Sequence, residues 1–223
     1  MLQHWLMKNN HCFQTSHAIE SYNAIRNLWD TPIFESQNFV AVPTVGALVE
    51  GWLLIVPRTP ILSFARISPP LFSELGIFLN EIVPAIESVY GPVSLFEHGP
   101  AFATSKVGCG VDYAHLHLVP VDCNLIEGAK QIAPWIRWGR VASIEDVSRF
   151  TSNNEGYWFV QQPFAGGECY VGLSSNTEPV SQLFRKVIAN HIGRPFDFDW
   201  KAYCGEDVIA ATVEKLTDAA ILV

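Results

Sequence analysis

Charged residues are scarce in this chain, and long apolar runs are absent from it. Asp, Glu, Lys and Arg make up 16% of the 223 residues and hydrophobic residues make up 49%, which is typical of a folded globular chain and not of a disordered one. The apolar runs, such as residues 52–56, are only as long as a strand, so we predict no membrane-spanning helix. The sequence has no internal repeat, low-complexity run or linker, which favours one ample core, or one domain with a large extension.

Basic residues are fewer than acidic ones. The chain holds 14 Lys and Arg against 22 Asp and Glu, which gives a formal net charge of −8. Because nucleic-acid binding needs a basic surface that neutralises phosphates, we expect no nucleic-acid partner. A small nucleotide held by backbone amides and a few side chains is compatible with this charge.

Paired cysteines and a targeting segment are also missing. The five cysteines, at positions 12, 109, 123, 169 and 204, are odd in number and form no Cys-x-x-Cys pair, so we predict reduced thiols, as in a cytoplasm. The first residues lack a basic segment followed by an apolar one, which predicts no signal peptide. We therefore expect a cytoplasmic protein with no membrane partner.

Two histidines stand two positions apart in a segment that alternates with period 2. In residues 113–120, Tyr113, His115 and His117 alternate with Ala114, Leu116 and Leu118, which predicts a half-buried strand. The first three side chains share one face, and the other three face the core. The two imidazoles, about 7 Å apart, can act on one small ligand near neutral pH. A catalytic pair, a shared metal ion and simple packing are all consistent with this pattern.

The residues around this segment add further candidates. Gly108, Cys109 and Gly110 predict a flexible turn whose amides can cradle an anion, and the Cys109 thiol is a candidate reactive group. His98 ends the preceding predicted strand, where it either supplies another imidazole or faces solvent in a turn. His115 and His117, with His98 or Cys109, would also suit zinc, so a metal site is one alternative.

The hydrophobic pattern predicts short strands and several helices. A stripe at helical spacing marks residues 68–86, where Ser68 is the expected N-cap and Pro84 predicts a kink or an earlier end. Further helices are predicted at 16–28, 124–132, 179–192 and 206–216, and a helical start at 144–147 after Ser143. Strands are predicted at 34–42, with a hairpin turn at 35–38, and at 51–58, 92–97, 113–120, 156–160 and 168–173.

The segment 113–119 resembles the motif His-φ-His-φ-His-φ-φ of the histidine triad family of nucleotide hydrolases and transferases. In this register Tyr113 stands at the first histidine, His115 at the second and His117 at the third. Residues 50–58 resemble the family's Pro-Gly-His-φ-φ-φ-φ-Pro-Lys segment, with Trp52 at the fourth histidine. The acidic ribose-contacting residue of the family falls near Thr44. The resemblance covers roughly residues 12–125.

The resemblance implies an α+β fold. We expect a mostly antiparallel sheet of about five strands with packed helices in residues 1–125, and an α/β extension in residues 126–223 packed on it as one unit. Residues 182–186 and 196–200 resemble the extension of larger family members. In this extension Arg185 and Lys186 either complete a core or subunit interface, or reach a substrate phosphate.

The resemblance also implies an activity. His115 would attack the α-phosphate of a nucleotide ester, anhydride or phosphoramidate and form a covalent nucleotidyl-histidine, without a metal or other cofactor. His117 would bind the phosphoryl oxygens or protonate the leaving group. A homodimer is possible by the same resemblance. The alternatives are a degenerate nucleotide-binding protein and a histidine-based metal site. The expected substrate contacts are Gly108, Cys109, Gly110, Tyr113, His98, Thr44 and Trp52.

Overall fold

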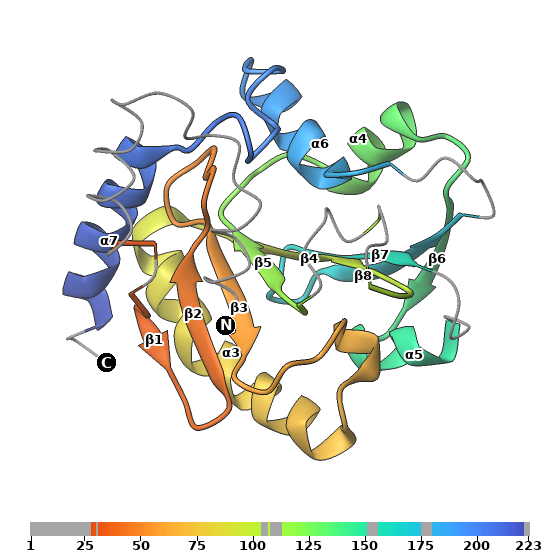
Figure 1. Ribbon diagram of the computed structural model, residues 1–223, viewed down its shortest axis with the longest axis horizontal. Coiled ribbons are helices and arrows are strands. Elements are labelled where there is room, and N and C mark those ends of the chain that lie inside the picture. Colours follow the sequence, from red (N-terminus) through yellow and green to blue (C-terminus); the bar gives the residue numbers. More distant parts are fainter. Residues whose placement is uncertain are drawn as a thin grey trace.

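One antiparallel sheet runs through the structure, a computed structural model that describes residues 28–29, 31–103, 107, 113–150, 156–174 and 180–220. Its eight strands follow the order β1-β2-β3-β5-β4-β7-β8-β6 (Figure 1). The α+β class is confirmed, but the sheet joins the strands of both parts of the chain instead of ending after about five. The strands are β1 Phe34–Glu35, β2 Phe39–Pro43, β3 Leu53–Pro57, β4 Ser94–Gly99, β5 Leu116–Val119, β6 Arg137–Val141, β7 Tyr157–Gln162 and β8 Glu168–Leu173.

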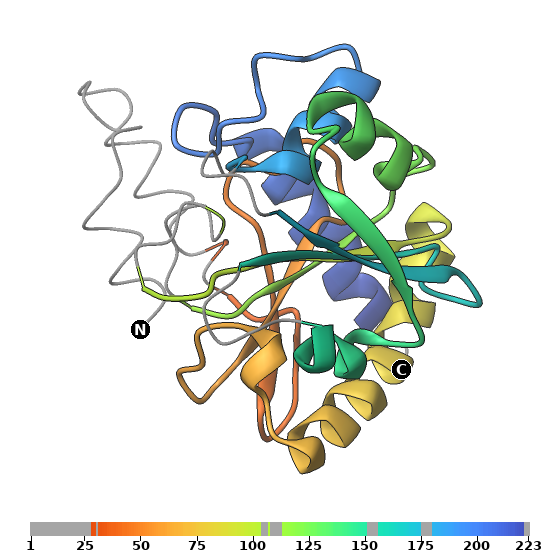
Figure 2. The same cartoon turned by 90° about the vertical axis from the view of Figure 1, so that its right-hand side faces the viewer.

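Helices cover both faces of this sheet. Figure 2 shows α4 and α6 on one side of the strands, and α3 and α5 on the other. Two short 3₁₀ segments, η2 (Phe64–Arg66) and η4 (Ile144–Asp146), lie in the connections. The described helices are α3 Pro69–Tyr90, α4 Leu125–Ile132, α5 Val147–Phe150, α6 Leu183–His191 and α7 Glu206–Ala220.

Strand alternation divides the buried side chains between two cores. On β4, Leu95 belongs to the core beside α3, whereas Phe96 belongs to the core beside α4 and α6. On β7, Phe159 and Trp158 are divided in the same way. All residues of β4 and β5 are buried as a result. Any site on the α4 and α6 face of these strands is therefore enclosed.

The histidine strand is shorter than predicted. β5 begins at Leu116 and not at residue 113, because the chain before it pairs with a loop. The Ala114 amide donates to the carbonyl oxygen of Ile61 at 2.7 Å. The predicted division of side chains is nevertheless confirmed, since Ala114, Leu116 and Leu118 all lie in the core beside α3.

Helix α3 continues past the proline that predicted its end. It begins after Ser68, the expected N-cap position, although the Ser68 side chain makes no capping hydrogen bond. Pro84 lies inside the helix, which runs on to Tyr90. Burial of the apolar stripe on both sides of the proline, including Ile82 and Ile86, offsets the missing backbone hydrogen bond. The expectation of an earlier end was wrong.

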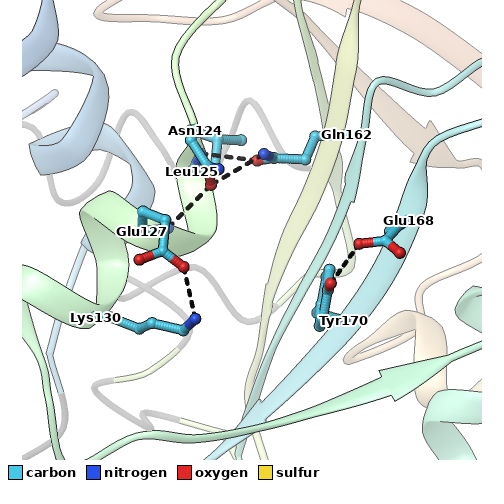
Figure 3. A network of polar contacts seen from close by, with 7 residues as sticks. All are labelled: Asn124, Leu125, Glu127, Lys130, Gln162, Glu168 and Tyr170. Carbon is cyan, nitrogen blue, oxygen red and sulfur yellow. Dashed lines mark hydrogen bonds and ion pairs between the residues drawn. The ribbon is translucent and has the colours of Figure 1, made fainter.

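Helix α4 is fastened to the sheet at its first turn (Figure 3). Asn124 is the predicted cap, and its Oδ1 accepts from the Glu127 amide at 3.0 Å. Gln162, at the end of β7, accepts from the Leu125 amide at 2.7 Å and donates to Asn124 Oδ1 at 3.2 Å. Figure 3 also shows Lys130 paired with Glu127 at 2.6 Å. These bonds hold α4 beside the strand that pairs with β4.

The C-terminal part of the chain contributes to the sheet and to one helix layer. β7 pairs with β4 and was predicted, whereas β6 was missed because residues 137–141 show no clean alternation. Gly193 ends α6 with a positive φ of 72°, as predicted. The predicted helix at 16–28 falls almost wholly outside the described residues, as does the turn at 108–110. Within the described residues, no helix combines the length and apolar character that crossing a bilayer requires.

Candidate functional site

His115 lies directly before β5 with one ring nitrogen bonded to the backbone. Its Nδ1 is 2.7 Å from the carbonyl oxygen of Tyr113. Because a carbonyl only accepts, Nδ1 carries the proton and Nε2 keeps a free lone pair. Burial lowers the pKa of His115, and the bond to Tyr113 partly opposes that shift. His115 is therefore a neutral imidazole with a fixed tautomer.

His117 has the opposite tautomer. The indole Nε1–H of Trp52 donates to His117 Nδ1 at 3.1 Å. An indole nitrogen can only donate, so Nδ1 holds a lone pair and the proton of the neutral ring lies on Nε2. The ring stacks on Phe96, with centroids 4.4 Å apart and planes 15° apart. Burial, followed by the charges of nearby groups, holds the pKa of His117 well below its usual value.

The two imidazoles meet edge to face. The centroids of His115 and His117 are 5.0 Å apart, and their planes cross at 70°. His115 has a lone pair on Nε2, and His117 has a proton on Nε2. Such a pair can attack an electrophilic atom and hydrogen-bond an oxygen attached to it.

His98 is a third buried imidazole beside this pair. It lies on β4 and is only 2% exposed, so the interpretation as a solvent-facing turn residue was wrong. Its Nε2 accepts from the Phe184 amide of α6 at 3.4 Å, which places the proton on Nδ1. That Nδ1–H has no hydrogen-bond partner among the described residues. The His98 ring centroid is 6.0 Å from that of His117.

Burial and nearby charges keep the three imidazoles uncharged. Burial first, then His115 and then Arg185, lower the pKa of His98 to about 3. The same groups, together with His98, lower the pKa of His117. All three imidazoles are therefore neutral over the physiological pH range.

The side chain of Tyr113 is hydrogen-bonded to the backbone. Its hydroxyl lies 2.8 Å from the carbonyl oxygen of Pro57 and 3.2 Å from that of Arg58, and donates to both. Burial raises the pKa of the phenol, so it is uncharged. Tyr113 thus acts on the site through its carbonyl, which orients His115.

Trp52 and Thr44 are buried side by side at the start of β3 and the end of β2. The Thr44 amide donates to the Trp52 carbonyl oxygen at 3.3 Å, and the Thr44 hydroxyl donates to the carbonyl oxygen of Val45 at 3.2 Å. Trp52 is fully buried and contacts the site through His117. Trp52 thus contacts His117 directly, and the contacts of Thr44 are with the backbone of Trp52 and Val45.

Arg185 is turned inward and not toward solvent. It is 2% exposed, and its Nε donates to the carbonyl oxygen of Phe198 at 2.7 Å. Its Nη2 donates to the carbonyl oxygen of Gly46, and the guanidinium carbon lies 5.0 Å from the centroid of the Trp52 ring. The Lys186 ammonium lies 4.9 Å from the Phe198 ring centroid. Arg185 therefore completes a core, which is one of its two predicted roles.

The sequence analysis did not predict that Phe96 and Phe184 pack around the imidazoles. Phe184 lies 4.9 Å from Phe96 and 5.3 Å from His98, measured between ring centroids. The register of β4 against β5 sets Phe96 opposite His117. Alternation along residues 95–98 would have placed Phe96 and His98 on one face, but their strand partner was not known from the sequence.

The structure does not describe the predicted anion-binding turn, but it does describe the histidines of the proposed metal site. Gly108, Cys109 and Gly110 lie outside the described residues. Among the residues that the structure does describe, no three His, Cys, Asp or Glu side chains are grouped to hold a metal ion. His115, His117 and His98 each also commit one ring nitrogen to a hydrogen bond within the protein.

No protein-family model matches the sequence, and no curated protein matches it either. The geometry of the three imidazoles and the motif resemblance are therefore the observations that bear on function.

Proposed function

We propose that this chain is a histidine triad-like nucleotidyl hydrolase or transferase that forms a covalent intermediate on His115. The observation that carries this proposal is the bond between His115 Nδ1 and the Tyr113 carbonyl oxygen. A histidine nucleophile needs an unprotonated nitrogen facing the substrate and a partner that fixes its tautomer. The Tyr113 carbonyl supplies that partner although the side chain is not a histidine.

The arrangement of the elements supports the same proposal. Strands β2, β3, β5 and β4 are successive antiparallel neighbours, with α3 between β3 and β4 in the chain. Helix α3 covers one face, and the imidazoles lie on the other. The histidine triad resemblance led us to expect such a layout within residues 1–125, and the order of these strands supports a core there.

The chemistry follows from the tautomers. His115 Nε2 attacks the α-phosphorus, a P–N bond to His115 forms, and the bond from phosphorus to the leaving oxygen, or to the leaving nitrogen of a phosphoramidate, breaks with its electron pair. His117 Nε2–H donates to a phosphoryl oxygen during this step, and His98 Nδ1–H offers a second donor. Water or another acceptor then attacks phosphorus and loses its proton to solvent, the P–N bond breaks with its electron pair going to Nε2, and neutral His115 returns.

Low exposure of the imidazoles favours a second candidate. His115 is 8% exposed and His117 is 5% exposed. A degenerate protein that binds a nucleotide in the same place without turnover would also bury these rings. Accessibility of His115 to a nucleotide is therefore the decisive property.

Intact-protein mass spectrometry tests the proposal. The protein is mixed briefly with dinucleoside polyphosphates, nucleotide sugars and nucleoside phosphoramidates, beside the variants His115→Ala and His191→Ala. His191 is a matched control because it lies at the end of α6, paired with Asp122 at 2.9 Å. An acid-labile gain of one nucleotide mass, lost in His115→Ala and kept in His191→Ala, is expected. Nucleotide binding with no adduct and no turnover would favour the degenerate protein.

A further inference from the structure

Trp52 makes protonation of His117 unfavourable. The hydrogen bond from Trp52 Nε1 at 3.1 Å needs a lone pair on His117 Nδ1. An imidazolium has a proton on both nitrogens, so charging His117 would set two N–H groups against each other in a buried place. This contact is additional to the general cost of charging a buried ring.

Arg185 holds Trp52 in this position from the C-terminal part of the chain. Its guanidinium lies over the Trp52 ring at 5.0 Å, and its bonds to the carbonyl oxygens of Gly46 and Phe198 fix its place. A cation over an indole face is attractive and strengthens the indole N–H as a donor. The positive charge also opposes a second positive charge on His117.

The other groups around His117 act in the same direction. β4 contributes Phe96, which stacks on the ring, and the neutral His98. The segment before β5 contributes His115, and α6 contributes Arg185. None of these described neighbours is a carboxylate that would stabilise an imidazolium. Glu97, the nearest acid in sequence on β4, lies in the opposite core, bonded to Tyr157.

We propose that Trp52 and Arg185 are positioning residues that keep His117 a neutral hydrogen-bond donor, so that the site takes nucleotides whose leaving group departs as an anion, which means phosphoanhydrides. This inference rests on the proposed function, and it narrows the expected substrates from nucleotide esters, anhydrides and phosphoramidates to anhydrides.

Proton balance gives the reason for this selectivity. When a phosphoanhydride bond breaks, the leaving phosphate keeps its electron pair as a stable anion, since its second pKa is near 6. An amine leaving from a phosphoramidate needs a proton, and so does an alkoxide leaving from a simple ester. A neutral His117 can hydrogen-bond such a group but is a poor acid, whereas an imidazolium would protonate it.

Nitrogen NMR of the histidine side chains tests the positioning role directly. In the wild-type chain we expect His117 to stay neutral, with its proton on Nε2, between pH 5 and 8. In Trp52→Phe we expect its pKa to rise toward the ordinary value and the tautomers to mix. Arg185→Met should shift the titration in the same direction, and Arg185→Lys, which keeps the charge, by less. Trp138→Phe is the control, because the Trp138 Nε1 bonds no described residue.

Kinetics tests the substrate class. We expect kcat/KM for a dinucleoside polyphosphate to exceed that for a phosphoramidate of the same nucleotide by about 10²-fold, the lower end of what a positioned acid contributes. Below pH 6.5, Trp52→Phe should raise kcat/KM for the phosphoramidate relative to kcat/KM for the phosphoanhydride. Trp138→Phe should leave this ratio unchanged.

The outcomes separate this inference from the proposed function. A wild-type His117 that titrates normally, or that carries its proton on Nδ1, overturns the inference even if His115 forms a nucleotide adduct. Equal turnover of both substrate classes also overturns it. Absence of any His115 adduct overturns the proposed function, and the NMR result then still decides the positioning role. If Trp52→Phe fails to fold, the wild-type titration and Arg185→Lys supply the answer.

Discussion

The Tyr113 hydroxyl lies 2.8 Å from the carbonyl oxygen of Pro57, the last residue of β3. The same tyrosine uses its own carbonyl oxygen to accept from His115 Nδ1. Its side chain therefore fixes the backbone that orients His115. The tautomer of His115 depends on the backbone at position 113 and not on a histidine side chain there.

Tyr113→Phe should weaken both the fold and the site to a small extent. Loss of the hydroxyl bond should lower the free energy of unfolding by about 1 kcal/mol, the usual contribution of one hydrogen bond. Nucleotidylation of His115 should slow by about threefold to tenfold, because the Tyr113 carbonyl loses its anchor and not its function. Urea unfolding and rapid-mixing mass spectrometry measure the two effects. Tyr170→Phe on β8 is the control and should leave the rate unchanged; a rate loss of 10³-fold at Tyr113 would instead indicate direct chemistry by the hydroxyl.

Paired amide substitutions should reveal which nitrogen of His98 matters. The amide nitrogen of an asparagine takes roughly the place of Nδ1, and that of a glutamine takes roughly the place of Nε2. If the unpartnered Nδ1–H donates to substrate, His98→Asn should keep most of the nucleotidylation rate, and His98→Gln should lose about 10²-fold, as for one oxyanion donor. Single-turnover kinetics measures both variants. The reverse pattern, with the rate kept in His98→Gln and lost in His98→Asn, would point to the bond from the Phe184 amide as the important contact.

Glu97 should make stability depend on pH in the neutral range. Burial raises its pKa from 4.5 to about 7, and the bonds from Tyr157 and Phe64 oppose this shift only in part. The folded state thus holds a proton that the unfolded state has lost, so stability is lost as pH rises from about 4.5 through 7. Between pH 5 and 8, the free energy of unfolding of Glu97→Gln should rise by about 2–3 kcal/mol relative to that of the wild type. This change corresponds to roughly two pKa units.

Unfolding in urea at several pH values measures this difference. The wild-type curve alone is not sufficient, because the buried histidines act in the opposite sense. The pKa of His98 is lowered to about 3, so stability is lost as pH falls from 6.5 toward 3. Subtracting the Glu97→Gln curve removes this common contribution. A difference that stays flat from pH 5 to 8 would show that Glu97 ionises normally.

Two glycines of positive φ should respond differently to alanine. At Gly46 (φ 73°) an added Cβ would lie 2.9 Å from Arg185 Nη2 and 2.8 Å from the Tyr203 carbonyl oxygen, whereas at Gly91 (φ 80°) it would meet nothing within 4 Å. Gly91→Ala should cost about 1–3 kcal/mol, the backbone penalty alone, because φ 80° with ψ −169° is a conformation that essentially only glycine adopts. Gly46→Ala should cost more, because Arg185 must also move. Thermal unfolding gives the stabilities; equal costs would mean that Arg185 adapts without loss.

Local sequence signals predicted much of the fold. The Asn124 cap, the Gly193 stop and the period-2 pattern of residues 113–118 were each sufficient to place an element or a face. Such signals depend on a few neighbouring residues and on backbone geometry. The exact start of β5 failed because Ala114 pairs with Ile61, a contact made in the folded chain only.

Only the site residues that lie close together in the sequence were predicted together. His115 and His117 follow from their own spacing, but the role of Trp52 depends on its pairing with His117 across 65 positions. Arg185 showed the same limit, because its bond to the Gly46 carbonyl oxygen joins residues 139 positions apart. Strand order and long-range packing set these partners, and a single sequence does not display them.

The pairing of β4 with β7 has a consequence for how the protein is made. Glu97 is synthesised 60 positions before Tyr157, its partner in the adjacent strand. A nascent β4 therefore leaves the ribosome with one edge bare until the later strand arrives. During this interval His98 has neither its neighbouring strand nor the α6 amide that fixes its tautomer. The layer of imidazoles is thus completed only after translation has passed the first turn of α6, and a ribosome stalled earlier would carry an aggregation-prone edge and an unfinished site.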